Sequence, residues 1–391
     1  MKTLLYLSTC MLVFLLLFSC VDDVTDYSSY NYPPSDHSVL SETLDLPEVP
    51  FNYSLELPEH IARQVFPRRV SNNRATLGRV LFYDKNLSRN GTVSCASCHK
   101  QELAFSDDVA FSKGFEGVET SRNSIALGSV LGFAGIYGSS GSSGHFGTAF
   151  FWDERAHSAS EQSLLSLTDN VEMGMTSESL LNTVKSKDYY KILFKTAYRD
   201  GEITEEKILL ALESFIDGIG SFKSKLDDAM IDNGQVLQFE DYLPGLTQEE
   251  NNGKTLFVDN CMVCHGTQFT ATHLSIANNG LDLNYADKGV GALVSLGNVM
   301  DGVFKVPALR NVQLTAPYMH DGRFSSLKEV IDFYSSGIQD HHNLSEHLKG
   351  ADGRAIKFNF SEKEKDELIT FLNTLTDPHF LVDEKFSDPF K

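Results

Sequence analysis

The stretches CASCH at residues 95–99 and CMVCH at residues 261–265 repeat one pattern, Cys-x-x-Cys-His. This spacing lets two thiols add to the two vinyl groups of one haem, while the adjacent histidine lies under the ring and ligates the iron. Two copies of the pattern therefore predict two covalently bound haem c groups. The predicted attachment and iron-binding residues are Cys95, Cys98, His99, Cys261, Cys264 and His265.

Four cysteines can also form a zinc site, two disulfides or a redox-active pair. Zinc ribbons usually separate their Cys-x-x-Cys pairs by about 15–20 residues, whereas Cys98 and Cys261 are 163 positions apart. A thioredoxin-like pair needs no histidine, yet a histidine follows both pairs at the same position. Haem attachment is the interpretation that accounts for both observations.

The N-terminus has the pattern of an export signal, which covalent haem attachment outside the bacterial cytoplasm requires. Lys2 precedes an apolar stretch over residues 4–18, and the sequence LFSC follows at residues 17–20. This predicts a lipoprotein signal peptide over residues 1–19, with Cys20 as the lipid-bearing first residue of the mature chain. The apolar stretch is shorter than the roughly 20 residues of a transmembrane helix. We expect a periplasmic protein held at the cell envelope by its lipid, with a plain secretory signal as the alternative.

The composition is that of a globular protein. The chain has 391 residues, of which 41% are hydrophobic, and a formal net charge of -20. This length favours about two to three domains. Such an acidic surface argues against a nucleic-acid partner. It could face a basic electron donor, but a solvated surface is the commoner meaning, so the charge alone does not identify a partner.

The organisation along the chain predicts two haem domains. Residues 20–58 are rich in Asp, Ser, Tyr and Pro without a helical period, which indicates a tether. Beyond them the apolar spacing is helical, with no sustained period-two alternation. The expected fold is therefore mainly α, with two cytochrome c-like haem domains that share an interface. We place the N-terminal haem domain at residues 59–245 and the C-terminal one at residues 246–391.

Local signals predict where several helices begin. Apolar residues at helical spacing from 208 to 226 indicate one long amphipathic helix with Thr204 as its N-cap. A capping-box pattern at residues 247–250 opens the helix that leads into the second haem motif, and another at residues 361–364 opens the last helix.

The sixth iron ligand decides between electron transfer and chemistry at the iron. A methionine or histidine there blocks the position, whereas an open position admits peroxide or another small ligand. Spacing alone does not choose among the candidates. They are Met173, Met175, His145 and His157 for the first haem, and Met300, Met319 and Tyr334 for the second.

Further motifs occur together and in one order along the chain. They are LGRVLFYD at residues 77–84, RNS at 122–124, FWDERA at 151–156, VEMG at 171–174 and APYMHDG at 316–322. With the first haem motif, this set resembles the bacterial dihaem cytochrome c peroxidase and MauG family over residues 74–376. The resemblance implies that the N-terminal haem reacts with hydrogen peroxide and that the C-terminal haem passes electrons.

The resemblance also implies roles around the first haem. Glu172 matches the family's distal carboxylate, which takes a proton from bound peroxide and returns it to the departing oxygen. Gln162 matches a distal-pocket glutamine that hydrogen-bonds the bound oxygen. Trp152, the only tryptophan of the chain, matches the indole that lies between the two haems. A core aromatic is the structural alternative for Trp152.

A calcium site between the haems is a further implication of the resemblance. Asn123 matches a ligand that contributes its side-chain oxygen, and Thr315 and Pro317 match two backbone carbonyl ligands. Water completes such an oxygen shell around a hard cation.

The chain departs from the peroxidases near the first haem. Those enzymes carry a ligating histidine sixteen residues after the first proximal histidine, and this chain has Phe115 there. Because phenylalanine cannot ligate iron, we expect a ferric first haem that is five-coordinate or water-bound and needs no reductive activation. His145, in a Gly/Ser-rich stretch, is the only nearby substitute.

A second departure concerns the other haem. The peroxidases place an axial methionine fourteen residues after the histidine of the HDG motif, and this chain has Tyr334 at that position, as MauG-type members do. The resemblance therefore implies Tyr334 as the axial ligand and Met319 as a packing residue. A phenolate is an anionic donor that lowers the iron potential. A tyrosine packed in a helix that begins near Ser326 is the alternative.

Together these observations predict a haem enzyme that uses hydrogen peroxide. We expect the enzyme to oxidise an electron donor, such as a small cytochrome c or a cupredoxin, or residues of a partner protein. The alternative is a dihaem electron carrier or a sensor that binds a small ligand without turnover. Glu172 and Gln162 argue against both, because neither needs a distal carboxylate.

Overall fold

The computed structural model describes residues 29–63, 67–128, 130–132, 149–266, 274–295 and 297–391. Within these residues the fold is mainly helical, as the sequence predicts, and its strands form two short antiparallel pairs. None of the helices in this part of the chain is long and apolar enough to cross a membrane. The predicted signal peptide and Cys20 lie outside the described residues.

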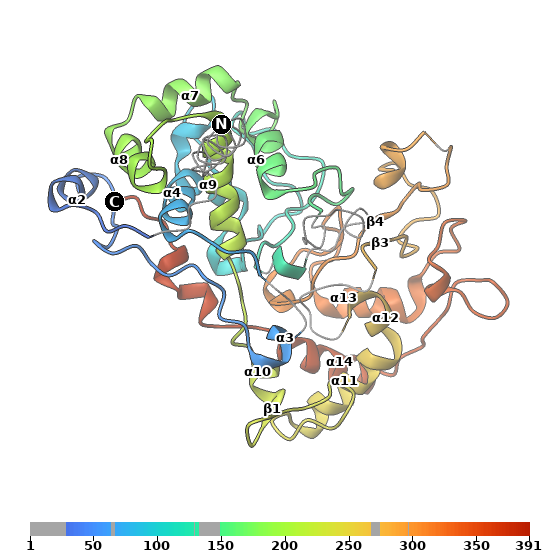
Figure 1. The fold of residues 1–391 in the computed structure, drawn as a ribbon. Coiled ribbons are helices and arrows are strands. Elements are labelled where there is room, and N and C mark those ends of the chain that lie inside the picture. Colours follow the sequence, from blue (N-terminus) through green and yellow to red (C-terminus); the bar gives the residue numbers. More distant parts are fainter. Residues whose placement is uncertain (1–28, 64–66, 129, 133–148, 267–273, 296) are drawn as a thin grey trace, which may run out of the picture.

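Figure 1 shows two groups of helices, one for each half of the chain. The first group contains α4 (Asn72–Tyr83), α5 (Cys95–Cys98), α6 (Ala159–Thr168), α7 (Ser177–Lys185), α8 (Asp188–Ala197) and α9 (Glu205–Gly218). The second group contains α10 (Lys225–Ala229), α11 (Gln248–Asn260), α12 (Met262–His265), α13 (Leu327–Asp332) and α14 (Glu362–Asn373). Strand β1 (Ile231–Asp232) pairs with β2 (Gln235–Val236), and β3 (Ile276–Ala277) pairs with β4 (Phe304–Lys305).

Each group is built on one close helix pair. Helix α4 packs on α9 in the first group, and α11 packs on α14 in the second. A Cβ added to Gly78 of α4 would lie 1.9 Å from the carbonyl oxygen of Ala211, and one added to Gly253 of α11 would lie 1.9 Å from that of Glu367. Only glycine permits such a close approach of two helix backbones. The helix that precedes each Cys-x-x-Cys-His motif thus uses a glycine to cross its partner.

The second hydrophobic core includes residues that precede the predicted boundary at residue 245. The second hydrophobic core already includes Leu226, Phe239 and Leu243, which pack with Phe257 and Phe371. Residues from α10 onward therefore belong to the C-terminal half.

The predicted tether is corrected for the part that the structure describes. Residues 30–58 include α2 (Pro34–Leu40), and their buried side chains Tyr32, Leu44 and Tyr53 belong to the first hydrophobic core. The C-terminal end of the chain returns to this segment, where Leu44 pairs with Phe390 and the Tyr53 hydroxyl donates to the carbonyl of Lys385, at 3.0 Å. Figure 1 shows this end beside α2 and α4. The polar composition of residues 30–58 suggested a tether, but contacts with distant parts of the chain hold this segment in place.

The long helix predicted up to residue 226 is shorter than expected. Thr204 caps it as predicted, by accepting from the backbone N–H of Lys207, but α9 ends at Gly218 and Ile219 is extended. The capping boxes that open α11 and α14 are both present. The residues that follow Ile219 enter a polar junction between the two halves.

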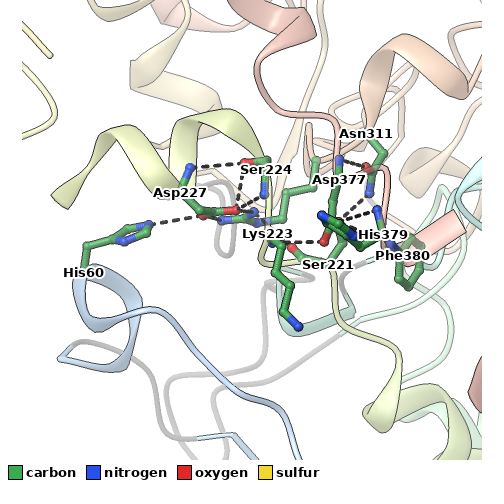
Figure 2. A network of polar contacts seen from close by, with 10 residues as sticks. His60, Ser221, Lys223, Ser224, Asp227, Asn311, Asp377, His379 and Phe380 are labelled. Atoms are coloured by element: carbon green, nitrogen blue, oxygen red, sulfur yellow. Dashed lines mark hydrogen bonds and ion pairs between the residues drawn. The ribbon is translucent and has the colours of Figure 1, made fainter. Parts of the chain in front are cut away.

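This junction holds the linker between α9 and α10 (Figure 2). The carboxylate of Asp377, which follows α14, accepts from the backbone N–H of Lys223 at 3.0 Å and from the Ser221 hydroxyl at 3.3 Å. Nearby, Asp227 of α10 accepts two hydrogen bonds from Arg310, each at 2.8 Å. Buried polar groups are thereby paired where the two halves meet.

His60 extends the junction to the N-terminal segment. It belongs to the short helix α3 (Glu59–Ala62) and lies 3.3 Å from Asp227 (Figure 2). The junction therefore connects the N-terminal segment, the interdomain linker and the residues that follow the last helix.

Candidate haem pockets

The first Cys-x-x-Cys-His motif opens onto a cavity of the N-terminal half. Helix α5 begins after Ser94, whose side chain forms a capping box with Ser97. This short turn places both thiols and the histidine on one cavity wall, as a haem c site requires. The described residues of this cavity include Cys95, Cys98, His99, Trp152, Gln162 and Glu172.

The imidazole of His99 is oriented by the backbone. Its Nδ1 lies 2.9 Å from the carbonyl oxygen of Phe105, which accepts a hydrogen bond from an Nδ1–H group. Such a bond fixes the tautomer and leaves Nε2 for a metal. Burial lowers the pKa of His99, partly offset by this hydrogen bond, which favours the neutral form that ligates iron. The residues of this cavity thus fit a haem c group.

Gln162 reaches the same cavity from α6, and Glu172 reaches it from the loop that follows this helix. The Gln162 amide donates to the Ser166 hydroxyl at 2.9 Å. Burial raises the pKa of Glu172, partly offset by a hydrogen bond with Ser166. A raised pKa makes a carboxylate a stronger base, which helps it to accept a proton from a reacting group and to return it.

Phe115 contacts the loop that carries Glu172 and helps to hold it in place. Its backbone N–H donates to the carbonyl of Glu172 at 3.0 Å, and its own carbonyl accepts from Asn90 at 2.6 Å. The ring packs against Gly174, where an added Cβ would meet it at 2.5 Å, and the Arg89 guanidinium lies 5.2 Å from the ring centre. Phe115 is not among the described residues that line the cavity. Its ring is thus part of the support for the Glu172 loop.

The second Cys-x-x-Cys-His motif opens onto a cavity of the C-terminal half. The backbone carbonyl of Pro307 lies 3.1 Å from Nδ1 of His265, in the same arrangement as at His99. Burial lowers the pKa of His265 to about 4. These residues also fit a haem c group. The described lining includes Cys261, Cys264, His265, Met319 and Tyr334.

Tyr334 lies in a π-helical turn, Phe333–Gly337, directly after α13. Such turns are frequent at functional sites. Its hydroxyl accepts a hydrogen bond from the amide of Asn279 at 3.3 Å, and the same amide lies 3.7 Å from the sulfur of Met319. Burial raises the pKa of Tyr334 to about 12, partly offset by Asn279. No sequence pattern identified Asn279, because it is 55 positions from Tyr334 and belongs to no motif.

Trp152 contributes to the walls of both cavities. Its indole N–H donates to the carbonyl of Asn123 at 2.9 Å, and its carbonyl accepts from the backbone N–H of Lys305 at 2.7 Å. Arg122 lies beside it and forms two hydrogen bonds with Asp287 of the C-terminal half, at 2.7 and 2.8 Å. The indole is therefore held at the interface of the two halves.

The predicted calcium ligands border a common cavity. Asn123, Thr315 and Pro317 all line the second cavity. The Asn123 amide nitrogen donates to the carbonyl of Val109 at 3.1 Å, which fixes the orientation of its oxygen. The described residues contain no cluster of three or more His, Cys, Asp or Glu side chains that could hold a metal, but an amide and two backbone carbonyls make a different kind of site.

The other candidate axial ligands lie in different environments. Met173 lines the first cavity and belongs to the hydrophobic core, whereas Met175 is buried in the core. His157 is exposed and Met300 is half-buried, and neither is among the described cavity-lining residues. His145 lies outside the described residues.

Comparisons with known proteins cover both halves of the chain. Residues 72–235 match the family described as di-haem cytochrome c peroxidase, and residues 250–376 match cytochrome c. The methylamine utilization protein MauG of Methylorubrum extorquens is 31% identical over 323 residues, which are 82% of this chain and 81% of the relative. The cytochrome c551 peroxidase of Nitrosomonas europaea is 29% identical over 307 residues, 77% of this chain and 79% of the relative.

A similar crystal structure supports the same grouping. It is a MauG-like protein associated with microbial copper homeostasis, with 30% sequence identity and a TM-score of 0.72. The match covers 86% of this chain and 99% of the other. Both halves are thus haem c domains in a known arrangement.

Proposed function

Because the chain belongs to the di-haem cytochrome c peroxidase and MauG family, we propose that it is a periplasmic peroxidase with two distinct haem sites. The site at residues 95–99 reduces hydrogen peroxide. The site at residues 261–265 passes the oxidising equivalents to an electron donor or a partner protein. The observation that carries this proposal is that Glu172 and Gln162 line the same cavity as His99.

The protein side chains divide the work at the first site. When bound, haem would supply the iron that binds hydrogen peroxide and donates the electrons for its reduction. Glu172 would accept a proton from the peroxide and return it to the oxygen that departs as water. Gln162 orients the oxygen by a hydrogen bond. The carbonyl of Phe105 holds the imidazole ring of His99 in place by a hydrogen bond. Trp152 lines both cavities and is the route by which electrons pass between them.

The first test is optical and EPR spectroscopy of the purified ferric protein, before and after one equivalent of hydrogen peroxide and without pre-reduction. We expect one high-spin and one low-spin haem, and an immediate spectral change with peroxide, because Phe115 cannot ligate iron. Two low-spin haems that ignore peroxide would instead indicate the electron carrier. A high-spin haem that binds peroxide without turnover would indicate the sensor.

Tyr334 is the proposed axial ligand of the second haem. It lies in the second cavity with its hydroxyl held by Asn279, and an anionic oxygen ligand lowers the iron potential. We expect Tyr334→Met to raise the potential of this haem strongly, whereas Met319→Leu should change it little. The reverse ranking in a redox titration would assign the ligand to Met319.

Calcium and the lipid are two further parts of the proposal. Asn123, Thr315 and Pro317 line the second cavity and offer oxygen ligands of the kind that calcium prefers. Removal of calcium with a chelator should slow the peroxide reaction, and added calcium should restore it.

Mass spectrometry of the membrane fraction should find a lipid-modified Cys20, and a Cys20→Ala variant should be released in soluble form.

A further inference from the structure

Glu154 has an unusual backbone conformation for its residue type. Its φ angle is 56°, in the left-handed region that favours glycine. The residue is only 3% exposed. A glutamate held there is strained, and such strain is typical of functional sites. The side chain must therefore contribute something that a glycine could not.

The side chain of Glu154 pairs with Lys305 across the two halves of the molecule. The carboxylate and the ammonium group are 3.6 Å apart, and both side chains are 1% exposed. Glu154 belongs to the loop after Trp152, and Lys305 belongs to β4 of the C-terminal half. Taking two charges out of water costs several kcal/mol per ion. Stability alone is therefore a weak reason for this pair.

The pair is attached directly to the tryptophan between the cavities. The Lys305 backbone N–H donates to the Trp152 carbonyl at 2.7 Å, and Glu154 follows two residues after the indole. Lys305 also lines the second cavity together with Cys261 and His265. Burial lowers the pKa of Lys305 to about 8, with Glu154 acting in the opposite direction. The ammonium form thus prevails at neutral pH.

We propose that the buried Glu154–Lys305 pair sets the reduction potential of the haem at residues 261–265. This rests on the proposed function, because it assigns that haem the passage of electrons. A cation near a redox centre favours its reduced form, and an anion favours its oxidised form. In a buried site of low dielectric constant these effects are strong. Glu154 and Lys305 are positioning residues, since neither takes part in the reaction with peroxide.

The test is an anaerobic redox titration of the holoprotein with both haems followed optically. Glu154→Gln removes the anion and should raise the potential of the second haem. Lys305→Met removes the cation and should lower it, while the backbone bond to Trp152 remains. The double variant should lie between the two. Opposite shifts distinguish an electrostatic role from loss of packing, which has no reason to follow the sign of the removed charge.

Two controls keep this test decisive. Glu154→Gly removes the same charge and suits the left-handed backbone, so it should fold well and match Glu154→Gln. Lys288→Met breaks an ion pair with Asp301 in which the lysine is half-exposed, and it should leave the potential unchanged. Shifts of one sign in both single variants, or none in either, would overturn the proposal. The peroxide reaction of the wild-type protein tests the peroxidase proposal separately.

Discussion

The carboxyl group of Glu172 combines two properties, a place in the first cavity and a pKa raised by burial. As a base it must be ionised when peroxide arrives. Because its pKa is raised, the ionised fraction falls at a higher pH than for an ordinary glutamate. The peroxide rate constant should therefore decrease as the pH falls through this raised pKa. Stopped-flow measurements across the acidic range should show this inflection.

Glu172→Gln should remove the inflection and lower the rate constant by about 10²–10⁴-fold, the usual contribution of a general acid–base group. Glu178→Gln is the matched control, because Glu178 is exposed at the start of α7. An inflection that persists in Glu172→Gln would assign the proton transfer to another group.

Asn279 shows the limit of sequence patterns at the scale of single residues. The two haem motifs can be recognised from the sequence alone, because the cysteines and the histidine of each lie within five residues. Asn279 reaches Tyr334 only through folding. A hydrogen bond to a phenolate withdraws charge from it. On the proposal that Tyr334 ligates the second haem, Asn279→Leu should make this ligand a stronger donor and lower the potential of that haem. A redox titration measures this, and an unchanged potential would show that Asn279 does not act on the ligand.

At the scale of elements, local signals were predictable and long-range contacts were not. Thr204 and the capping boxes begin their helices where the sequence places them, since a cap depends on residues three positions away. The path of the chain after α9 involves Asp377 instead, which is 154 residues from Lys223. Residues 30–58 looked like a tether because their partners, such as Lys385, lie at the other end of the chain.

The crossings of α4 with α9 and of α11 with α14 give a prediction for whole elements. Gly78→Ala should destabilise the protein by about 1–3 kcal/mol, because overpacking forces backbone shifts where the new Cβ would lie 1.9 Å from the Ala211 carbonyl oxygen. Gly350→Ala is the control, since its added Cβ would meet nothing closer than 3.2 Å. Thermal unfolding followed by circular dichroism compares the two. Equal melting temperatures would mean that the helices separate at no cost.

At the scale of the whole molecule, the junction around Asp227 connects parts of the chain that lie far apart in sequence. Burial acts to raise the pKa of Asp227, but Arg310 and His60 outweigh it and hold this pKa well below its ordinary value. A carboxylate with a depressed pKa contributes stability above its ordinary pKa and loses it as the pH falls towards the lowered one. The native protein should therefore lose stability in strong acid partly through this residue.

Asp227→Asn tests that contribution. It leaves Arg310 buried without its carboxylate, and breaking one side of a buried ion pair costs about 3–5 kcal/mol. The loss should be largest near neutral pH and shrink in acid, where the wild-type carboxylate also becomes protonated. Glu362→Gln, in an exposed pair with Lys328, should leave the unfolding curve close to that of the wild type. Denaturant unfolding at neutral and acidic pH measures both variants, and a loss that is independent of pH would show that Asp227 acts by its shape rather than by its charge.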